Sequence, residues 1–180
     1  MKLVIPECCL LVIDVQSRLL PVMHEPQTLL ENLIKAIKGF QLLEIPILLT
    51  EQYPQGLGPT VPELRSLLSS QNPIEKNSFS CCNEEKFLTE LRSLNRSQVV
   101  VCGIEAHICV CQTCLDLQNR GYEVFLLTDA IASRKNSDRE LTLRVLEKEG
   151  INLTGVEMAL FSLLETCRHP RFKEIAAVIK

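Results

Sequence analysis

The chain alternates short, nearly continuous apolar runs with longer segments whose apolar residues recur at helical spacing. A run such as residues 8–15 is typical of a strand buried on both faces, whereas residues 29–43 place their apolar side chains on one helical stripe. Strands are predicted at residues 8–15, 47–50, 73–76, 98–103, 122–128 and 152–154. Helices are predicted at residues 29–43, 61–69, 84–94, 107–120, 138–148 and 158–164, with a last one opening at Pro170. Such alternation predicts a three-layer α/β fold, with a parallel sheet covered on both faces.

Length and composition fit one globular domain, and residues 1–180 are expected to form it. Hydrophobic residues make up 46% and charged residues 23%, which argues against disorder or a fibre. The 19 basic and 22 acidic residues are scattered along the chain, so neither a nucleic acid nor a membrane is an expected partner. The nine cysteines are an odd number, and no export signal is recognised, so we expect a reduced, cytoplasmic protein.

Chemically reactive side chains follow the ends of the predicted strands. Asp14 follows the first apolar run, Lys76 ends the third strand, and Cys109 comes shortly after the fourth. Ligands of open α/β sheets bind outside the carboxyl ends of the strands. If the strand order is 3-2-1-4-5-6, the first and fourth strands are neighbours, and Asp14 would face Cys109. The sequence therefore predicts a site that contains an acid, an ammonium group and a thiol.

Each of these three residues also has an ordinary structural explanation. Cys109 could be a buried cysteine that fills space, which is the commoner fate of free cysteines. Asp14 could cap a loop or pair with Arg18, and Lys76 could be a solvated surface lysine. The functional interpretation depends on their convergence at one edge of the sheet.

The expected position of Cys109 predicts an activated thiol. In the first turn of a helix, free backbone N–H groups and the helix dipole stabilise an anion. With Lys76 nearby, we expect the pKa of the Cys109 thiol to lie below its free value of about 8.5, although Asp14 would act in the opposite direction. His107 lies two residues away, or about 200° around a helix, so it is not expected to be the base for this thiol.

The sequence Cys111-Gln-Thr-Cys114 allows two other interpretations. A redox dithiol would sit at the start of a helix, whereas these residues lie deeper, so packing on a helix face is favoured. A zinc site that includes Cys81 and Cys82 would lack a second C-x-x-C spacing. The sequence contains no G-x-G-x-x-G, phosphate-binding loop, G-x-S-x-G or H-E-x-x-H motif, and we expect neither a metal nor another cofactor.

Six segments together resemble the isochorismatase-like hydrolase family, and among its members the isochorismatase domain-containing proteins. They include Leu-Val-Ile-Asp-Val-Gln at residues 11–16 and Cys-Gly-Ile-Glu-Ala-His-Ile-Cys-Val at residues 102–110. The others are residues 50–64, 76–80, 128–134 and 169–175, so the resemblance extends over essentially the whole chain. It implies a Rossmann-like sheet of about six parallel strands and a homo-oligomer, a dimer or larger.

The resemblance also implies roles for individual residues. Cys109 would be the nucleophile, Asp14 the general base and Lys76 the stabilising cation. A cis peptide bond between Ile104 and Glu105 would direct the backbone N–H groups of Glu105 and Cys109 at an oxyanion. Residues expected to contact the substrate are Gln16, Tyr53, Phe79, His107 and Ile108.

Two departures from the family narrow the expected reaction. The chain lacks the Asp-x-His set that holds a metal in the nicotinamidase branch, and true isochorismatases cleave a vinyl ether without the cysteine. We therefore expect a metal-independent cysteine hydrolase that cleaves a small amide-like or ester-like substrate through a thioacyl intermediate. The alternative is a non-catalytic ligand-binding module on the same fold.

Overall fold

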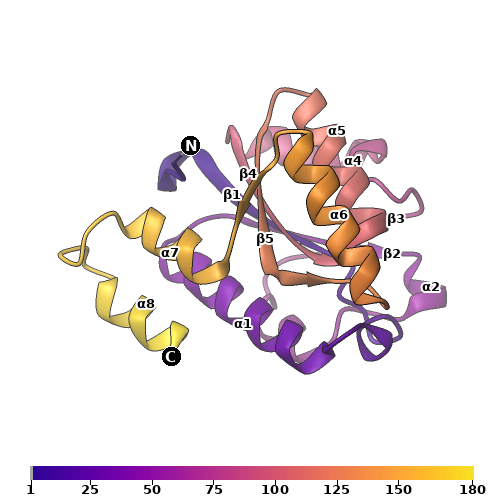
Figure 1. Ribbon diagram of the computed structural model, residues 1–180, viewed down its shortest axis with the longest axis horizontal. Coiled ribbons are helices and arrows are strands. Elements are labelled where there is room, and N and C mark those ends of the chain that lie inside the picture. The colour runs from indigo at the N-terminus through magenta and orange to yellow at the C-terminus, as the bar shows by residue number, and fades with distance from the viewer. Residues whose placement is uncertain (1) are drawn as a thin grey trace.

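A computed structural model describes residues 2–180, which build a parallel sheet covered by helices on both faces (Figure 1). The sheet has six strands in the order β3-β2-β1-β4-β5-β6, and every neighbouring pair is parallel. The strands are β1 (Cys8–Ile13), β2 (Ile47–Gln52), β3 (Ile74–Lys76), β4 (Gln98–Ile104), β5 (Glu123–Ala132) and β6 (Asn152–Thr154). The predicted three-layer fold and strand order are confirmed.

The helices lie between successive strands and after β6. They are α1 (Pro26–Leu42), α2 (Pro54–Leu57), α3 (Pro62–Leu67), α4 (Glu85–Ser93), α5 (Cys111–Asn119), α6 (Asn136–Lys148), α7 (Val156–Leu164) and α8 (Phe172–Ile179). The sequence pattern missed α2, a single turn that begins at Pro54 and ends where Gly58 adopts a φ of +78°. Among residues 2–180, no helix combines the length and apolar character needed to cross a membrane.

Two apolar clusters lie on opposite faces of the sheet. Alternate residues of β1 divide between them, because successive side chains of a strand point to opposite faces. Leu10 and Val12 pack with α1, α3, α7 and α8, whereas Leu11 and Ile13 pack with α4, α5 and α6. Figure 1 shows α1, α7 and α8 on one side of the strands and α4, α5 and α6 on the other. A strand that is buried on both faces explains why residues 8–13 form a continuous apolar run.

The two central strands approach closely where β1 ends. Gly103 of β4 is paired with Ile13 of β1 and has a φ of +117°. A Cβ atom on Gly103 would lie 2.1 Å from the Ile13 carbonyl oxygen, so a side chain cannot be accommodated there. Asp14 follows directly with a φ of +53°, a left-handed conformation that turns the chain at the carboxyl edge of the sheet. This close approach brings the end of β1 next to the loop that follows β4.

Candidate active site

Asp14, Lys76 and Cys109 meet at the carboxyl edge of the sheet. The Lys76 Nζ lies 2.7 Å from Asp14 Oδ2, and the two side chains are 1% and 0% exposed. The Cys109 thiol is buried at the same edge, close enough to both side chains for them to shift its pKa. The convergence predicted from the strand ends is thus present in the structure, with an acid, an ammonium and a thiol in mutual contact.

The carboxylate of Asp14 is held from several directions. Thr50, on the neighbouring strand β2, donates its hydroxyl to Asp14 Oδ1 at 2.7 Å. Burial raises the pKa of the Asp14 carboxyl, and the Lys76 charge and the Thr50 hydrogen bond offset this rise only in part. A carboxylate with a raised pKa is a better proton acceptor, which suits a general base.

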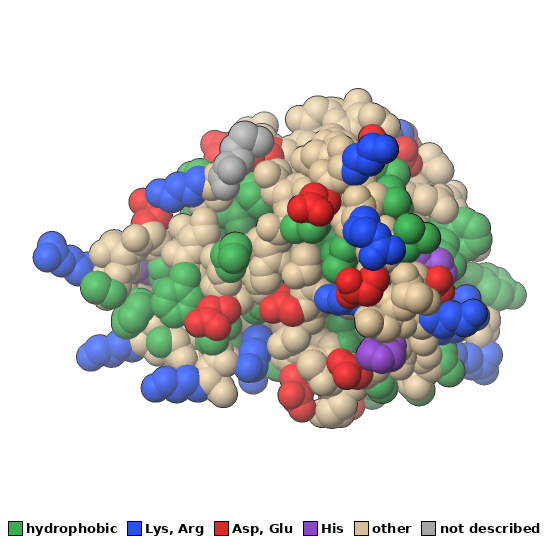
Figure 2. Space-filling model, in the orientation of Figure 1, with side chains coloured by type: hydrophobic (Ala, Val, Ile, Leu, Met, Phe, Trp, Pro, Cys, Tyr) green, Lys and Arg blue, Asp and Glu red, His purple; other side chains and the backbone are tan. Residues whose placement is uncertain are grey.

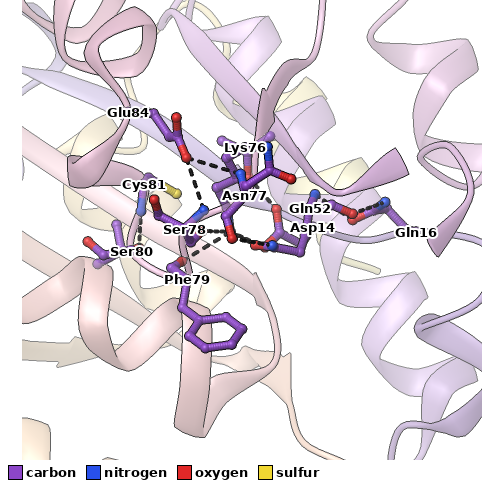
Figure 3. A network of polar contacts seen from close by, with 12 residues as sticks. Asp14, Gln16, Gln52, Lys76, Asn77, Ser78, Phe79, Ser80, Cys81 and Glu84 are labelled. Carbon is purple, nitrogen blue, oxygen red and sulfur yellow. Dashed lines mark hydrogen bonds and ion pairs between the residues drawn. The ribbon is translucent and has the colours of Figure 1, made fainter. Parts of the chain in front are cut away.

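The ammonium of Lys76 is surrounded by oxygen atoms. Besides Asp14, Gln52 Oε1 accepts from Lys76 Nζ at 2.7 Å, and the carbonyl oxygens of Ser78 and Phe79 accept at 3.2 and 3.0 Å (Figure 3). Burial lowers the pKa of the Lys76 ammonium, but the Asp14 carboxylate and nearby thiols outweigh it, so the net pKa is above its usual value. Lys76 is therefore a permanent positive charge at neutral pH.

Cys109 does not have the acidic thiol that its position in the sequence suggested. Burial and then the Asp14 carboxylate raise the pKa of Cys109 to about 12, while Lys76 lowers it by less. The local backbone also differs from the expected first turn of an α-helix. Residues Ala106–Val110 form a π-helical turn ahead of α5, with the Val110 N–H donating to the Glu105 carbonyl oxygen at 3.2 Å. The resting thiol thus keeps its proton until a base removes it.

The turn before Cys109 contains the expected cis peptide bond between Ile104 and Glu105. The Glu105 side chain is buried and accepts from Arg134 Nε at 3.0 Å and from the Arg134 backbone N–H at 3.3 Å. This carboxylate therefore faces β5 and its following loop. An oxyanion hole formed by the backbone N–H groups of Glu105 and Cys109 stays a prediction.

Four of the five residues expected to contact substrate lie at or near the surface. Tyr53 and Phe79 are 53% and 54% exposed, and the Phe79 ring points away from the polar network in Figure 3. Ile108 is half-buried against the apolar cluster that includes Cys109. His107 Nδ1 lies 2.8 Å from Ser133 Oγ, which orients its ring toward the end of β5. Their contact with a substrate stays a prediction.

Gln16, the fifth of these residues, is fully buried. Its Nε2 donates to the carbonyl oxygens of Gln52 and Gly58 at 3.0 and 2.6 Å, and its Oε1 accepts from the Gln52 backbone N–H at 2.8 Å. Both ends of the amide are thus occupied by backbone, which favours a supporting role for Gln16 over direct contact with substrate.

The sequence placed Gln52 at the carboxyl end of the second strand but assigned it no role in the site. Gln52 ends β2 and is paired in register with Lys76, which ends β3. The rule that located Lys76, a polar residue at the carboxyl end of a strand, also applies to Gln52. A neutral amide has no charge to mark it, so the contact became visible only with the strands paired.

All nine cysteines are free thiols, and most are buried. Cys114 is fully buried in the apolar cluster that also contains Cys81 and Cys82, and Cys111 packs against its edge. This position agrees with packing on a helix face. Among residues 2–180, no three His, Cys, Asp or Glu side chains are arranged to hold a metal ion.

Comparisons with known proteins show which family the chain is similar to. The family model described as the isochorismatase domain matches residues 8–158. Isochorismatase domain-containing protein 2 of Danio rerio is 39% identical over 171 residues, which cover 94% of this chain and 85% of that protein.

Two solved structures share the fold. The structure named MAR1 ribonuclease from Caenorhabditis elegans superposes with a TM-score of 0.94 at 33% identity, covering 99% of this chain and 92% of that one. The YcaC gene product of Escherichia coli, described as an octameric hydrolase of unknown specificity, gives a TM-score of 0.94 at 21% identity. This superposition covers 99% of this chain and 89% of the YcaC chain. At 21% identity the likeness concerns the fold alone.

Proposed function

The chain belongs to the isochorismatase family, and from this premise we propose that it is a metal-independent cysteine hydrolase of small amide-like or ester-like substrates. The observation that carries the proposal is the buried contact of Cys109 with both Asp14 and Lys76. A thiol, a base and a fixed positive charge are the groups that covalent acyl transfer requires. The assignment of residues 1–180 to one hydrolase domain is part of the same proposal.

The reaction would begin with the protonated thiol. Asp14 accepts the Cys109 proton as the sulfur attacks the acyl carbon, and the oxygen of the tetrahedral intermediate is held by the backbone N–H groups of Glu105 and Cys109. The leaving amine or alcohol takes the proton from Asp14 and departs, which leaves a thioester on Cys109. Asp14 then removes a proton from water, the hydroxide attacks the thioester, and the acid product and the thiol are released.

The raised pKa values of the two groups suit this sequence of steps. The thiol pKa of about 12 keeps Cys109 protonated at neutral pH, and the raised pKa of Asp14 makes the carboxylate a stronger base. Lys76 remains charged throughout, and its ammonium stabilises the thiolate as it forms. The proton thus moves between two buried groups beside a constant charge.

Loss of the nucleophile tests the proposal. A panel of small amides and esters should reveal a substrate that wild-type protein hydrolyses and Cys109→Ala does not, and mass spectrometry should detect an acyl adduct on Cys109 during turnover. Cys167→Ala removes an exposed cysteine and should leave the rate unchanged. Full activity of Cys109→Ala on the same substrate would contradict the mechanism. A pocket that binds compounds from the panel without cleaving any of them would favour the non-catalytic ligand-binding module.

RNA is a second candidate substrate, because a relative 33% identical to this chain carries the name ribonuclease. A phosphodiester has no acyl carbon for Cys109 to attack. The net charge is −3, and on the face drawn in Figure 2 basic and acidic side chains are interspersed. Proteins that bind the phosphate backbone of a nucleic acid depend on a basic surface. We therefore favour a small amide-like or ester-like substrate over RNA. If the wild-type protein cleaves a labelled RNA and Cys109→Ala cleaves it equally well, this preference would be reversed.

We also propose that the protein is a homo-oligomer, as the Escherichia coli relative is described to be. Several large apolar side chains are exposed in the isolated chain, among them Leu141 and Val145 on α6 and Met158 on α7. Light scattering at micromolar concentration should give a multiple of 20.3 kDa. A mass equal to one chain would contradict the proposal.

A further inference from the structure

Gln52 touches the active-site lysine without being charged itself. Its Oε1 accepts from Lys76 Nζ at 2.7 Å, the same distance that separates the ammonium from Asp14 Oδ2. At the other end of the amide, Nε2 donates to the Asn77 carbonyl oxygen at 2.8 Å. Because Nε2 has a carbonyl partner, the amide cannot turn over without placing two oxygens or two N–H groups against each other. The oxygen of Gln52 is therefore directed at Lys76 by its own second contact.

The surroundings of Gln52 hold it in that place. Its backbone N–H and carbonyl oxygen are both bonded to the buried side-chain amide of Gln16, at 2.8 and 3.0 Å. On the far side, Glu84 Oε1 accepts from the backbone N–H groups of Asn77 and Ser78, each at 3.0 Å. Figure 3 shows these contacts as one connected network between β1, β2 and the loop after β3. Gln52 thus links the Lys76 ammonium to two backbone segments, one bonded to Gln16 and the other to Glu84.

The Lys76 ammonium has three hydrogens and lies within hydrogen-bond reach of four oxygen atoms. They are Asp14 Oδ2, Gln52 Oε1 and the Ser78 and Phe79 carbonyl oxygens, and the Cys109 sulfur lies close enough for the ammonium to lower its pKa. Asp14 and Cys109 exchange a proton in the proposed reaction, so their attraction for the ammonium changes at each step. Gln52 and the two carbonyl groups are neutral throughout. They can hold the charge in place while its two ionisable neighbours change.

We infer that Gln52 is a positioning residue that keeps the Lys76 ammonium against Cys109, so that the thiolate is stabilised when it forms. The inference deepens the proposed function and rests on it for the role of Cys109. Its content is nevertheless a statement about the reactivity of one thiol, which can be measured without any substrate. If Gln52 loses its oxygen, the ammonium can turn toward the remaining oxygens, and the thiolate of Cys109 loses part of its stabilisation.

Alkylation of Cys109 by iodoacetamide provides the measurement. Rates are followed from pH 7 to pH 9 by peptide-resolved mass spectrometry, with the exposed Cys167 of the same chain as internal reference. In Gln52→Met, a rise of half to one unit in the thiol pKa would slow Cys109 alkylation about three- to tenfold at every pH below that pKa. Gln52→Asn keeps an amide but is one methylene shorter, so the same slowing is expected. The Cys167 rate should not change.

The direction of the change separates a positioning role from loss of structure. A variant that merely loosens the fold exposes Cys109 and speeds its alkylation. A Cys109 rate that is unchanged or faster in folded Gln52→Met and Gln52→Asn would therefore overturn the inference. Gln41→Met is the matched control, because it removes a hydrogen bond of 2.7 Å to the Leu67 carbonyl oxygen on the exposed surface. It should leave the Cys109 rate at the wild-type value.

A double variant tests whether Gln52 acts through Lys76. Lys76→Met alone should slow Cys109 alkylation, and adding Gln52→Met should slow it no further, because the group to be positioned is gone. An equal additional slowing would show that Gln52 acts in another way and would overturn the inference. Failure of the hydrolase proposal would look different. No thioester would form on any substrate, and the effect of Gln52 on alkylation would stand.

Discussion

Replacing Lys76 with methionine is the sharpest test of the buried ion pair. The variant keeps an unbranched side chain of similar length but removes the ammonium that lies 2.7 Å from Asp14 Oδ2. Asp14 would keep the Thr50 hydroxyl at 2.7 Å but would lose the opposite charge. Removing one partner of a buried pair typically costs about 3–5 kcal/mol. With both side chains excluded from water here, we expect Lys76→Met to lower the free energy of unfolding by about that amount at pH 7.

The loss should depend on pH, because the remaining carboxyl group can take up a proton. Burial raises the pKa of Asp14, and the Lys76 charge opposes this rise, so the pKa of Asp14 should be higher still in the variant. A carboxyl whose pKa is higher in the folded than in the unfolded chain makes folding less favourable as the pH increases between the two values. The loss in free energy of unfolding caused by Lys76→Met should therefore be smaller at low pH than at high pH, and should change by at most about 1.4 kcal/mol per pH unit.

Urea unfolding followed by far-ultraviolet circular dichroism at pH 5, 6, 7 and 8 measures both effects. Circular dichroism is the suitable signal because the chain has no tryptophan and two tyrosines. Lys86→Met replaces an exposed lysine on α4 and should change stability by less than about 0.5 kcal/mol. Asp14→Asn combined with Lys76→Met removes both charges and should recover part of the loss. A loss below about 1 kcal/mol that does not vary with pH would refute the reasoning.

Other predictions follow from single contacts. Gly103→Ala should lower the free energy of unfolding by about 3 kcal/mol or more, because the new Cβ would clash with the Ile13 carbonyl oxygen. Gly121 also has a positive φ, but a Cβ there would meet no atom within 4 Å, so Gly121→Ala should lower it by only about 1–2 kcal/mol. Thermal melting of the two variants compares them directly, and equal losses would contradict the close approach of the central strands. Glu84→Gln should cost about 1 kcal/mol at pH 7. The Glu84 carboxylate has a lowered pKa because backbone N–H groups donate hydrogen bonds to it. Its contribution to stability is therefore present above about pH 4 and disappears as the pH falls further. Urea unfolding should show a smaller stability difference between Glu84→Gln and wild type at pH 3.5 than at pH 7. Alkylation of wild-type Cys109 should keep accelerating beyond pH 9, since its thiol pKa is about 12, and a plateau near pH 7 would contradict this.

Cys109 and Gln52 illustrate what a single sequence leaves open. The pattern of residues predicted Cys109 as an activated thiol, yet the structure raises its pKa to about 12. A helix start and a nearby lysine were visible in the sequence. The depth of burial and the Asp14 carboxylate, which together outweigh them, depend on how distant parts of the chain pack around the sulfur. Gln52 was passed over for a related reason, since its importance comes from its partner on β3 and not from its own chemistry.

The sequence alone determined the architecture and the edge of the sheet where the site lies. Apolar runs and amphipathic segments alternate along the chain, and parallel strands joined by helices must bring their carboxyl ends to one side, which is why Asp14, Lys76 and Cys109 could be named beforehand. Only the tertiary structure decided the charge states and contacts within that site: the 2.7 Å ion pair, the neutral thiol and the amide that holds the ammonium. The physical reason is that the alternation of strands and helices follows from local patterns, whereas a buried pKa is the balance of desolvation and partners from distant parts of the chain, all within a few ångströms.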